Sequence, residues 1–452
     1  MGKLHENDLF LEKIKTLINE NKNKVLKKEL GDFHYADIAD LIKQISLDEA
    51  IHIVKLLEND ISAEALAEVD ESFRERIISK LSAKEIAEEI EELDTDDAAD
   101  LVGELPEILQ EKVLSKIEDA EHSQDIRELL NYDEGTAGAL MAKELVSVNE
   151  NLSVINCVRE MRKQAKEVTR VHSIYVINSK NRLLGRLSLK DLLTANTKAK
   201  VKDIYIPNVD FVNVKEDVNE VANIMSKYDL EAIPVVNDKK ILLGRITIDD
   251  VLDIIKEEAE KDYQLAAGIS KEVEANDNIF ELTRARLPWL FLGLIGGLGS
   301  VFILKDFEEI MIRSELRSLF FYTPLIAAMA GNVGVQSSAI IVQGIANQVI
   351  KGSLINRLFK EIGLGLINGL ILSIVLIIFG EIIDQDMLLS LTVAGSMMSV
   401  IILSALIGTF VPIILHRQGF DPAIATGPFI TTANDIFGIF LFFYIAKSIL
   451  GF

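Results

Sequence analysis

The last third of the chain alternates between long apolar runs and short polar loops. Five runs each approach the roughly 20 residues that a membrane-spanning helix needs. They cover residues 287–304, 320–345, 361–379, 388–415 and 427–449. We therefore expect a membrane domain of five helices over residues 287–452.

The charges between these runs predict how the helices cross the bilayer. Lys and Arg gather before the first run and in the loops after the second and fourth, whereas the loop after the third carries only acidic charges. Basic loops tend to stay in the cytoplasm. The rule predicts a multi-pass protein of the cell (inner) membrane with a cytoplasmic N-terminal region and an external C-terminus. Lys305, Arg313 and Arg317, in the first external loop, run against it.

Residues 1–135 show the period of short amphipathic helices and no strand alternation. The segment 36–57 repeats as 84–105, with matching apolar positions such as Ile38/Ile86 and Ile42/Ile90. A repeat of this kind predicts an all-α helical-repeat domain.

Residues 144–262 change to a strand–helix–strand–strand–helix pattern that occurs twice. The expected helices are 154–164 and 218–228, and the expected strands are 145–148, 173–178, 183–188, 211–214, 232–237 and 242–247. LLGRLSLKDLL and LLGRITIDDVL repeat in residue type, and the segment resembles a tandem pair of CBS domains, at 136–203 and 204–252. The resemblance implies a candidate site for ATP or another adenine nucleotide at Ser188/Asp191 and Thr247/Asp250. The alternative is that both motifs only help the domains to fold.

Charge separates the chain into two parts. Residues 1–286 hold 39 Lys and Arg against 60 Asp and Glu, which is −21 of the formal total of −23. Such a charge argues against nucleic acid and favours cations, although solvated acidic helices are the commoner explanation. The single cysteine, Cys157, allows no intrachain disulfide and fits a reducing compartment.

Asp435 is a carboxylate inside the fifth apolar run. An ionised Asp in hydrocarbon is costly, so it is expected to face a protein interior or a water-filled path. Thr431 and Asn434 add oxygen atoms that suit a hard cation such as Mg²⁺. The alternative is a carboxylate satisfied by hydrogen bonds between helices.

The second apolar run also carries polar groups at membrane depth, among them Asn332. Pro324, Gly331 and Gly334 can interrupt this helix, and irregular backbone there is tolerated only where it is buried or lines a cavity. Hydrogen bonding between helices is the alternative role for these polar groups.

Acidic residues also concentrate in two soluble segments. Asp94 is expected to cap a helix, whereas Asp96 and Asp100 form an i/i+4 like-charge pair that repels unless a cation lies nearby. An acidic linker helix, assigned to 253–286, joins the CBS pair to the membrane domain and contains Asp253, Glu258 and Asp262.

The order of these parts, with AGNVGVQSS at 330–338 and GFDPAIATGPFITTANDIFG at 419–438, resembles the MgtE-type magnesium channels over essentially the whole chain. The resemblance implies a homodimer whose pore lies between protomers, with Asp435 and Thr431 holding a hydrated Mg²⁺. It also implies cytosolic Mg²⁺ sensing that closes the pore. The implied sensor residues are Asp96, Asp100, Asp229, Asp250, Asp253, Glu258, Asp262 and Asp421. Asn219 and Lys261 stand where carboxylates are expected, so one or two sensor sites are in doubt.

The sequence leaves other functions open. A transporter of another divalent cation, such as Co²⁺ or Mn²⁺, needs the same carboxylate, and a membrane-anchored CBS regulator with a structural Asp435 is a further alternative. HExxH, Walker A and GxSxG motifs are absent from the sequence, which argues against an enzyme. We expect the bilayer and a second copy of the chain as partners, and no obligatory other protein.

Overall fold

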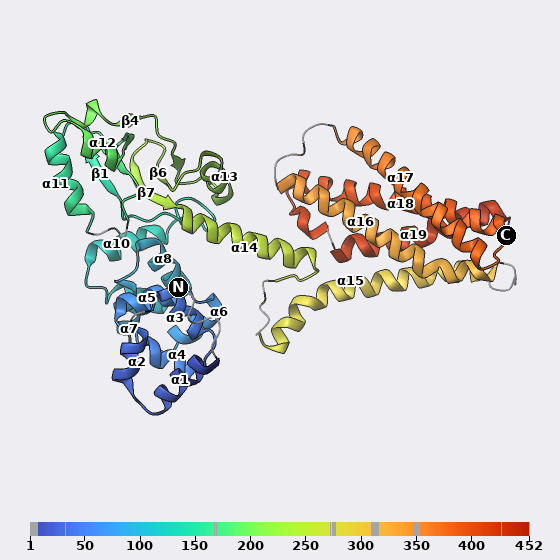
Figure 1. The fold of residues 1–452 in the computed structure, drawn as a ribbon, viewed down its shortest axis with the longest axis horizontal. Helices are drawn as coiled ribbons and strands as arrows, with labels where there is room; N and C mark the ends of the chain where they lie inside the picture. Colours follow the sequence, from blue (N-terminus) through green and yellow to red (C-terminus); the bar gives the residue numbers. More distant parts are fainter. Residues whose placement is uncertain are drawn as a thin grey trace. The chain divides into compact units, whose positions relative to one another are not determined.

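The computed structural model describes residues 8–31, 33–166, 168, 170–271, 273, 277–308, 316–346, 350, 353–425 and 427–451. The chain divides into two compact units, residues 1–255 and 256–452, shown as the blue-to-green and the yellow-to-red parts of Figure 1. The predicted multidomain class is confirmed: a helical N-terminal domain, a CBS pair with strands, an acidic helix and five long apolar helices.

In the part of the N-terminal domain that the structure describes, the chain forms ten short helices. They are α1 (Asp8–Asn19), α2 (Asn23–Leu30), α3 (Tyr35–Ile42), α4 (Leu47–Val54), α5 (Asn59–Ala67), α6 (Glu71–Ile78), α7 (Ala83–Ile90), α8 (Thr95–Gly103), α9 (Glu107–Leu114) and α10 (Ala120–Leu129). Ser46 and Ser82 start α4 and α7 with capping boxes, which satisfy backbone N–H groups that the helix leaves free. The repeated residues Ile38 and Ile86 are both buried, so the sequence repeat is a repeat of core positions.

The described residues of the CBS pair form two small sheets. The first has strand order β1 (Val146–Asn149), β2 (Ile174–Ile177), β3 (Leu183–Leu187) and β4 (Ile206–Pro207), and the second has β5 (Val212–Asn213), β6 (Ala232–Val236) and β7 (Leu242–Thr247). In each sheet the first two strands are parallel and the third is antiparallel to the second. The helices are α11 (Val154–Gln164), α12 (Leu189–Thr194) and α13 (Val218–Tyr228), and α11 and α13 have the predicted bounds.

One hydrophobic core joins the helical domain to the second CBS copy. Buried side chains of α7 and α8, such as Ile90 and Val102, belong to the same cluster as Val235 and Ile246 of β6 and β7. The acidic helix α14 (Ile248–Ala266) begins directly after β7. The shared core therefore fixes the start of α8 close to the end of β7, where the acidic groups of both elements meet.

The second unit contains the five predicted spans. They are α15 (Ile279–Asp306), α16 (Thr323–Ala346), α17 (Leu354–Ile382), α18 (Met387–Arg417) and α19 (Gly427–Leu450), with 3₁₀ turns η3 (Arg317–Tyr322) and η4 (Pro422–Ala425) before α16 and α19. Helix α18 packs against α16, α17 and α19, and α15 packs against α19.

The expected interruption of the second span is wrong, because α16 is continuous. Pro324 lies in its first turn, where a missing N–H leaves no hydrogen bond unmade. Gly331 and Gly334 are buried and lie against α19. These glycines therefore allow close helix packing and do not break the helix.

Candidate functional site

Asp435 lies on α19, half-buried, at the contact with α16. A Cβ atom built on Gly331 of α16 would stand 3.7 Å from Asp435 Oδ1 and 3.2 Å from the Thr431 methyl group. Among the residues that the structure describes, none donates a hydrogen bond to the Asp435 carboxylate or pairs with it. An intramembrane carboxylate without a partner among the described residues is expected to face water or a further polar group.

Thr431 lies one turn before Asp435 on the same face of α19, as the i/i+4 spacing requires. Its hydroxyl donates to the Gly427 carbonyl at 3.0 Å. The hydroxyl oxygen keeps lone pairs that can accept a hydrogen bond from a water molecule. Thr431 and Asp435 thus place two oxygen-bearing side chains along the contact between α16 and α19, which we call the α16–α19 seam.

Asn434 is fully buried and packs against a different glycine of α16. A Cβ on Gly334 would stand 1.8 Å from Asn434 Nδ2, so the close approach requires glycine there. Neither amide atom of Asn434 has a hydrogen-bond partner in the described part of the chain. The structure therefore places Asn434 inside the helix bundle. Asn332, one residue after Gly331, is exposed in the single chain.

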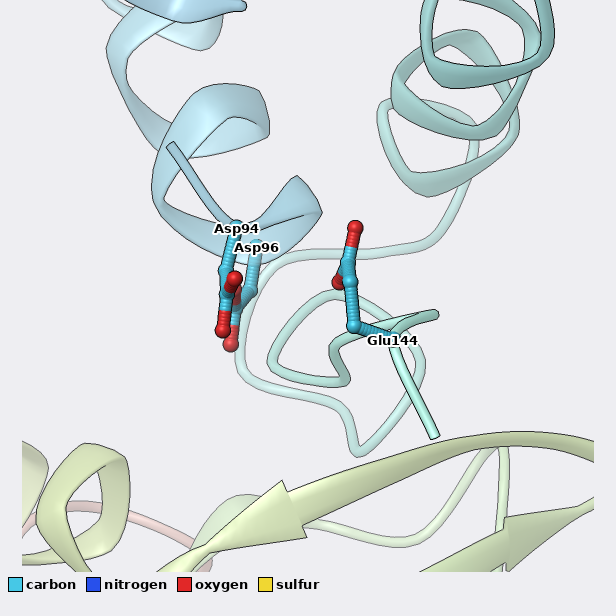
Figure 2. A group of neighbouring side chains, drawn as sticks. All are labelled: Asp94, Asp96 and Glu144. Atoms are coloured by element: carbon cyan, nitrogen blue, oxygen red, sulfur yellow. The ribbon is translucent and has the colours of Figure 1, made fainter. Parts of the chain in front are cut away.

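A second group of polar side chains lies in the soluble unit. Figure 2 shows Asp94 and Asp96 at the start of α8, opposite Glu144 from the loop before β1. Ligand oxygens of these three residues all lie within 4.8 Å of one another. Three carboxylates at this spacing form an oxygen site of the kind that binds a hard divalent cation.

The expected capping role of Asp94 is wrong in one respect. Asp94 stands at the N-cap position of α8, but its side chain makes no capping hydrogen bond. Instead, its carboxylate lies 3.7 Å from the Arg245 guanidinium of β7. Thr95 donates to Glu144 through its hydroxyl at 2.8 Å, which ties the start of α8 to the same loop.

Burial and mutual repulsion raise the pKa values of this acidic group. Burial, with the Glu144 charge, raises the pKa of Asp94 to about 6. Burial, followed by the charges of Asp97 and Asp250, raises the pKa of Asp96 well above its ordinary value. Asp97 keeps contact with solvent at the rim, yet desolvation and Asp250 raise its pKa to about 7. Burial and repulsion disfavour the charged form of these carboxylates, so a cation that neutralises them lowers the free energy of the group.

The two candidate nucleotide motifs both form closed local pairs. Ser188 donates to Asp191 at 2.7 Å, and Thr247 donates to Asp250 at 2.5 Å. These bonds also begin α12 and fix the first turn of α14. Asp250 therefore belongs both to the second motif and to the acidic group at α8, because its charge raises the pKa values of Asp96 and Asp97.

The structure separates the other predicted sensor residues. Asp100, Asp229 and Asp253 are exposed, and Asp229 ends α13 in the left-handed conformation. In the second unit, burial and the charges of Asp421 and Glu258 raise the pKa of Asp262. These three carboxylates form a further acidic group, beside which Lys261 supplies a positive charge. Asn219 lies in the first turn of α13, where its N–H donates to Asp217.

Glu144 and Arg245 take part in the acidic group at α8 but were not predicted from the sequence pattern. Glu144 lies in a loop without periodicity, and Arg245 lies in a strand motif that occurs twice. Both copies of the motif carry the arginine, as Arg186 and Arg245, and only the structure shows that Arg186 is exposed whereas Arg245 is buried.

Comparison with known proteins agrees with this division of the chain. A family model described as MgtE, divalent cation transporter, matches residues 323–445, and the MgtE intracellular N domain matches 33–135. The CBS domain model matches 137–198 and 201–257. A magnesium transporter MgtE of Bacillus subtilis is 33% identical over 71% of each chain. The chain belongs to the MgtE family.

Other relatives extend the match. The magnesium transporter MgtE of Thermus thermophilus is 34% identical over 71% of this chain and 72% of its own. The soluble part of a magnesium transporter superposes with a TM-score of 0.50 at 26% identity, covering 55% of this chain and 98% of that one. The cytosolic domain of the Mg²⁺ channel MgtE in complex with ATP gives 0.51 at 30% identity, covering 54% and 99%. The relatives in Bacillus subtilis and Thermus thermophilus are named as magnesium transporters, and transporters are not enzymes.

Proposed function

We propose that this MgtE family member carries Mg²⁺ across the cell membrane and that Mg²⁺ binding to its cytosolic carboxylates closes the path. The observation that carries the proposal is Asp435, a half-buried carboxylate of α19 with no partner among the described residues of its own chain. A passing cation satisfies that carboxylate and then leaves it unpaired again.

The proposed path runs between two copies of the chain. One Asp435 and one Thr431 supply few ligands, and Mg²⁺ loses its water reluctantly, so a ring of oxygens from two protomers around a hydrated ion suits its chemistry. Asn332 supports this arrangement, because a polar side chain exposed on a membrane helix needs water or another helix. Asn434, from inside the bundle, would fix the α16–α19 seam. The cytosolic domains and the basic loops would lie on the same side of the membrane, with the C-terminus outside.

The proposed gate is the acidic group where α8 meets β7 and α14. Without Mg²⁺ the carboxylates of Asp94, Asp96, Glu144 and Asp250 repel, which opposes docking of the helical domain on the CBS pair. Mg²⁺ binds the docked arrangement more tightly and so shifts the equilibrium toward it. In the second unit, Glu258, Asp262 and Asp421 would respond in the same way, with Asp100, Asp229 and Asp253 at the margins. The CBS pair is also proposed to bind ATP, in line with the relative solved as an ATP complex.

Flux through purified protein in liposomes tests this function. We expect Mg²⁺ entry in the wild type, loss of entry in Asp435→Ala, and suppression as Mg²⁺ on the cytosolic side rises. Co²⁺ or Mn²⁺ carried in preference to Mg²⁺ would favour the transporter of another divalent cation. Absence of any divalent flux in the wild type would favour the membrane-anchored regulator.

A further inference from the structure

Arg245 is a buried arginine at the contact between three parts of the soluble unit. Its side chain is 7% exposed, and its guanidinium reaches Asp94 of the helical domain at 3.7 Å. Its Nη1 donates to the backbone carbonyl of Arg170, in the first CBS copy, at 3.0 Å. Its own strand, β7, belongs to the second copy.

The surroundings of Arg245 are strongly acidic. Its charge lowers the pKa values of Asp94 and Asp250, against the effect of burial on both. Glu144 and Asp96 lie within 4.8 Å of Asp94. The Nε–H of Arg245 is buried without a hydrogen-bond partner in the described residues. One guanidinium therefore faces several carboxylates and is itself incompletely satisfied.

The internal repeat shows that this placement is particular to the second copy. Arg186 occupies the equivalent position of β3, where its side chain is exposed. The same motif thus places one arginine in solvent and the other inside an acidic contact.

We propose that Arg245 is a tethered cation of the Mg²⁺ sensor, an inference that rests on the proposed function. Its guanidinium neutralises part of the acidic group, so it offsets some of the repulsion that opposes docking when Mg²⁺ is scarce, and it limits how much Mg²⁺ the docked state takes up. Arginine suits this role because it stays charged at every physiological pH. Removing its charge weakens docking without Mg²⁺ and makes docking depend more steeply on Mg²⁺.

Limited digestion of the full-length protein across a Mg²⁺ series tests the role. Chymotrypsin is suitable because none of the three substitutions below removes one of its sites. Arg245→Gln keeps a hydrogen-bond donor for the Arg170 carbonyl and removes the charge, Arg245→Lys keeps the charge, and Arg186→Gln is the matched control. We expect Arg245→Gln to be cut several-fold faster than wild type without Mg²⁺ and at the wild-type rate in saturating Mg²⁺. We expect Arg245→Lys and Arg186→Gln to stay close to wild type throughout.

Three results would overturn the proposal. If Arg245→Gln is cut faster than wild type even in saturating Mg²⁺, the role of the arginine is purely structural. If Arg245→Gln is cut at the wild-type rate without Mg²⁺, the charge of Arg245 does not hold the domains together. Wild-type protein whose digestion ignores Mg²⁺ would reject the sensor itself, and the tethered cation with it.

Discussion

The acidic group of the soluble unit and Asp435 of the membrane unit use the same functional group in opposite ways. At the start of α8, one chain gathers several carboxylates around a single arginine, and their pKa values rise together. On α19, one carboxylate stands without a partner among the described residues. A dense negative site retains a divalent ion and can act as a switch, whereas a sparse one releases it, as conduction requires.

The two units also differ in how their elements pack. The soluble unit buries branched aliphatic side chains such as Ile38 and Ile86. The membrane unit brings backbones together through small residues: a Cβ on Gly408 would lie 2.4 Å from the Gly334 carbonyl, and one on Gly438 would lie 2.9 Å from Ala330. Lipid gives apolar side chains little reason to leave it, so close backbone contact adds to the packing of buried side chains such as Phe442 and Phe443 there.

Removing the sparse site should have the largest effect. Asp435→Asn keeps the size of the side chain and removes its charge, so we expect Mg²⁺ flux to fall at least about tenfold, a loss of about 1.4 kcal/mol of ion stabilisation. The cytosolic response of the protein to Mg²⁺ should persist. Asp384→Asn, in the exposed turn after α17, is the control and should transport normally. Equal flux in both variants, measured in liposomes, would remove Asp435 from the path.

The glycine contact should be next in size. Gly334→Ala places a methyl group against Asn434 in the α16–α19 seam, and overpacking of this kind costs about 1–3 kcal/mol. We expect a lower melting temperature in detergent together with reduced flux. Gly363→Ala on α17 is the matched control, because a Cβ there meets no atom within 4 Å. If the Gly334→Ala protein is as stable as this control, the α16–α19 seam has room for the added methyl group.

Lowering the charge of the dense site should change its Mg²⁺ response several-fold. Asp96→Asn removes one repelling charge, so we expect slower digestion without Mg²⁺ and a weaker dependence on Mg²⁺, the reverse of Arg245→Gln. Asp48 offers a control, since it occupies the equivalent position of the repeat in α4 and is exposed. If Asp48→Asn and Asp96→Asn behave alike, burial at this contact has no bearing on sensing.

A change of pH should give the smallest effect. Docking raises the pKa of Asp94 to about 6 and that of Asp97 to about 7, from 3.8, so the docked state binds protons more tightly than the separated domains. Docking without Mg²⁺ should therefore be strongest near or below the ordinary pKa and weaken as the pH rises through about 6 to 7. Digestion rates of metal-free protein between about pH 5 and pH 8 measure this. Faster digestion toward the acidic end would contradict the assignment.

Local signals predicted those parts of the fold that depend on neighbouring residues in the sequence. Helices α11 and α13 have their predicted bounds because Ser153 and Asp217 cap them and their apolar residues keep the helical period. The strand β4 was missed, since Ile206–Pro207 gives two residues and no alternation. Five spans followed from hydropathy alone, because each is longer than the membrane requires.

Contacts between distant segments account for what the sequence could not supply. Whether Gly334 breaks a helix or admits a neighbour depends on Asn434, which lies on a different span. Asp96 was predicted as part of an acidic segment, but its neighbour Glu144 comes from a loop 48 residues later. The roles proposed for the selected carboxylates remain predictions, which the experiments above address.

The polar centre of α19 also bears on how the protein enters the membrane. Asp and Asn near the middle of a span oppose its transfer from the translocon into lipid, by about 2.5–3.5 kcal/mol for the Asp alone. Helices α15, α16 and α18, which pack against α19, are all synthesised before it. The span that carries Asp435 and Asn434 is therefore inserted after these helices, when the surface that accepts Asn434 is already in the bilayer.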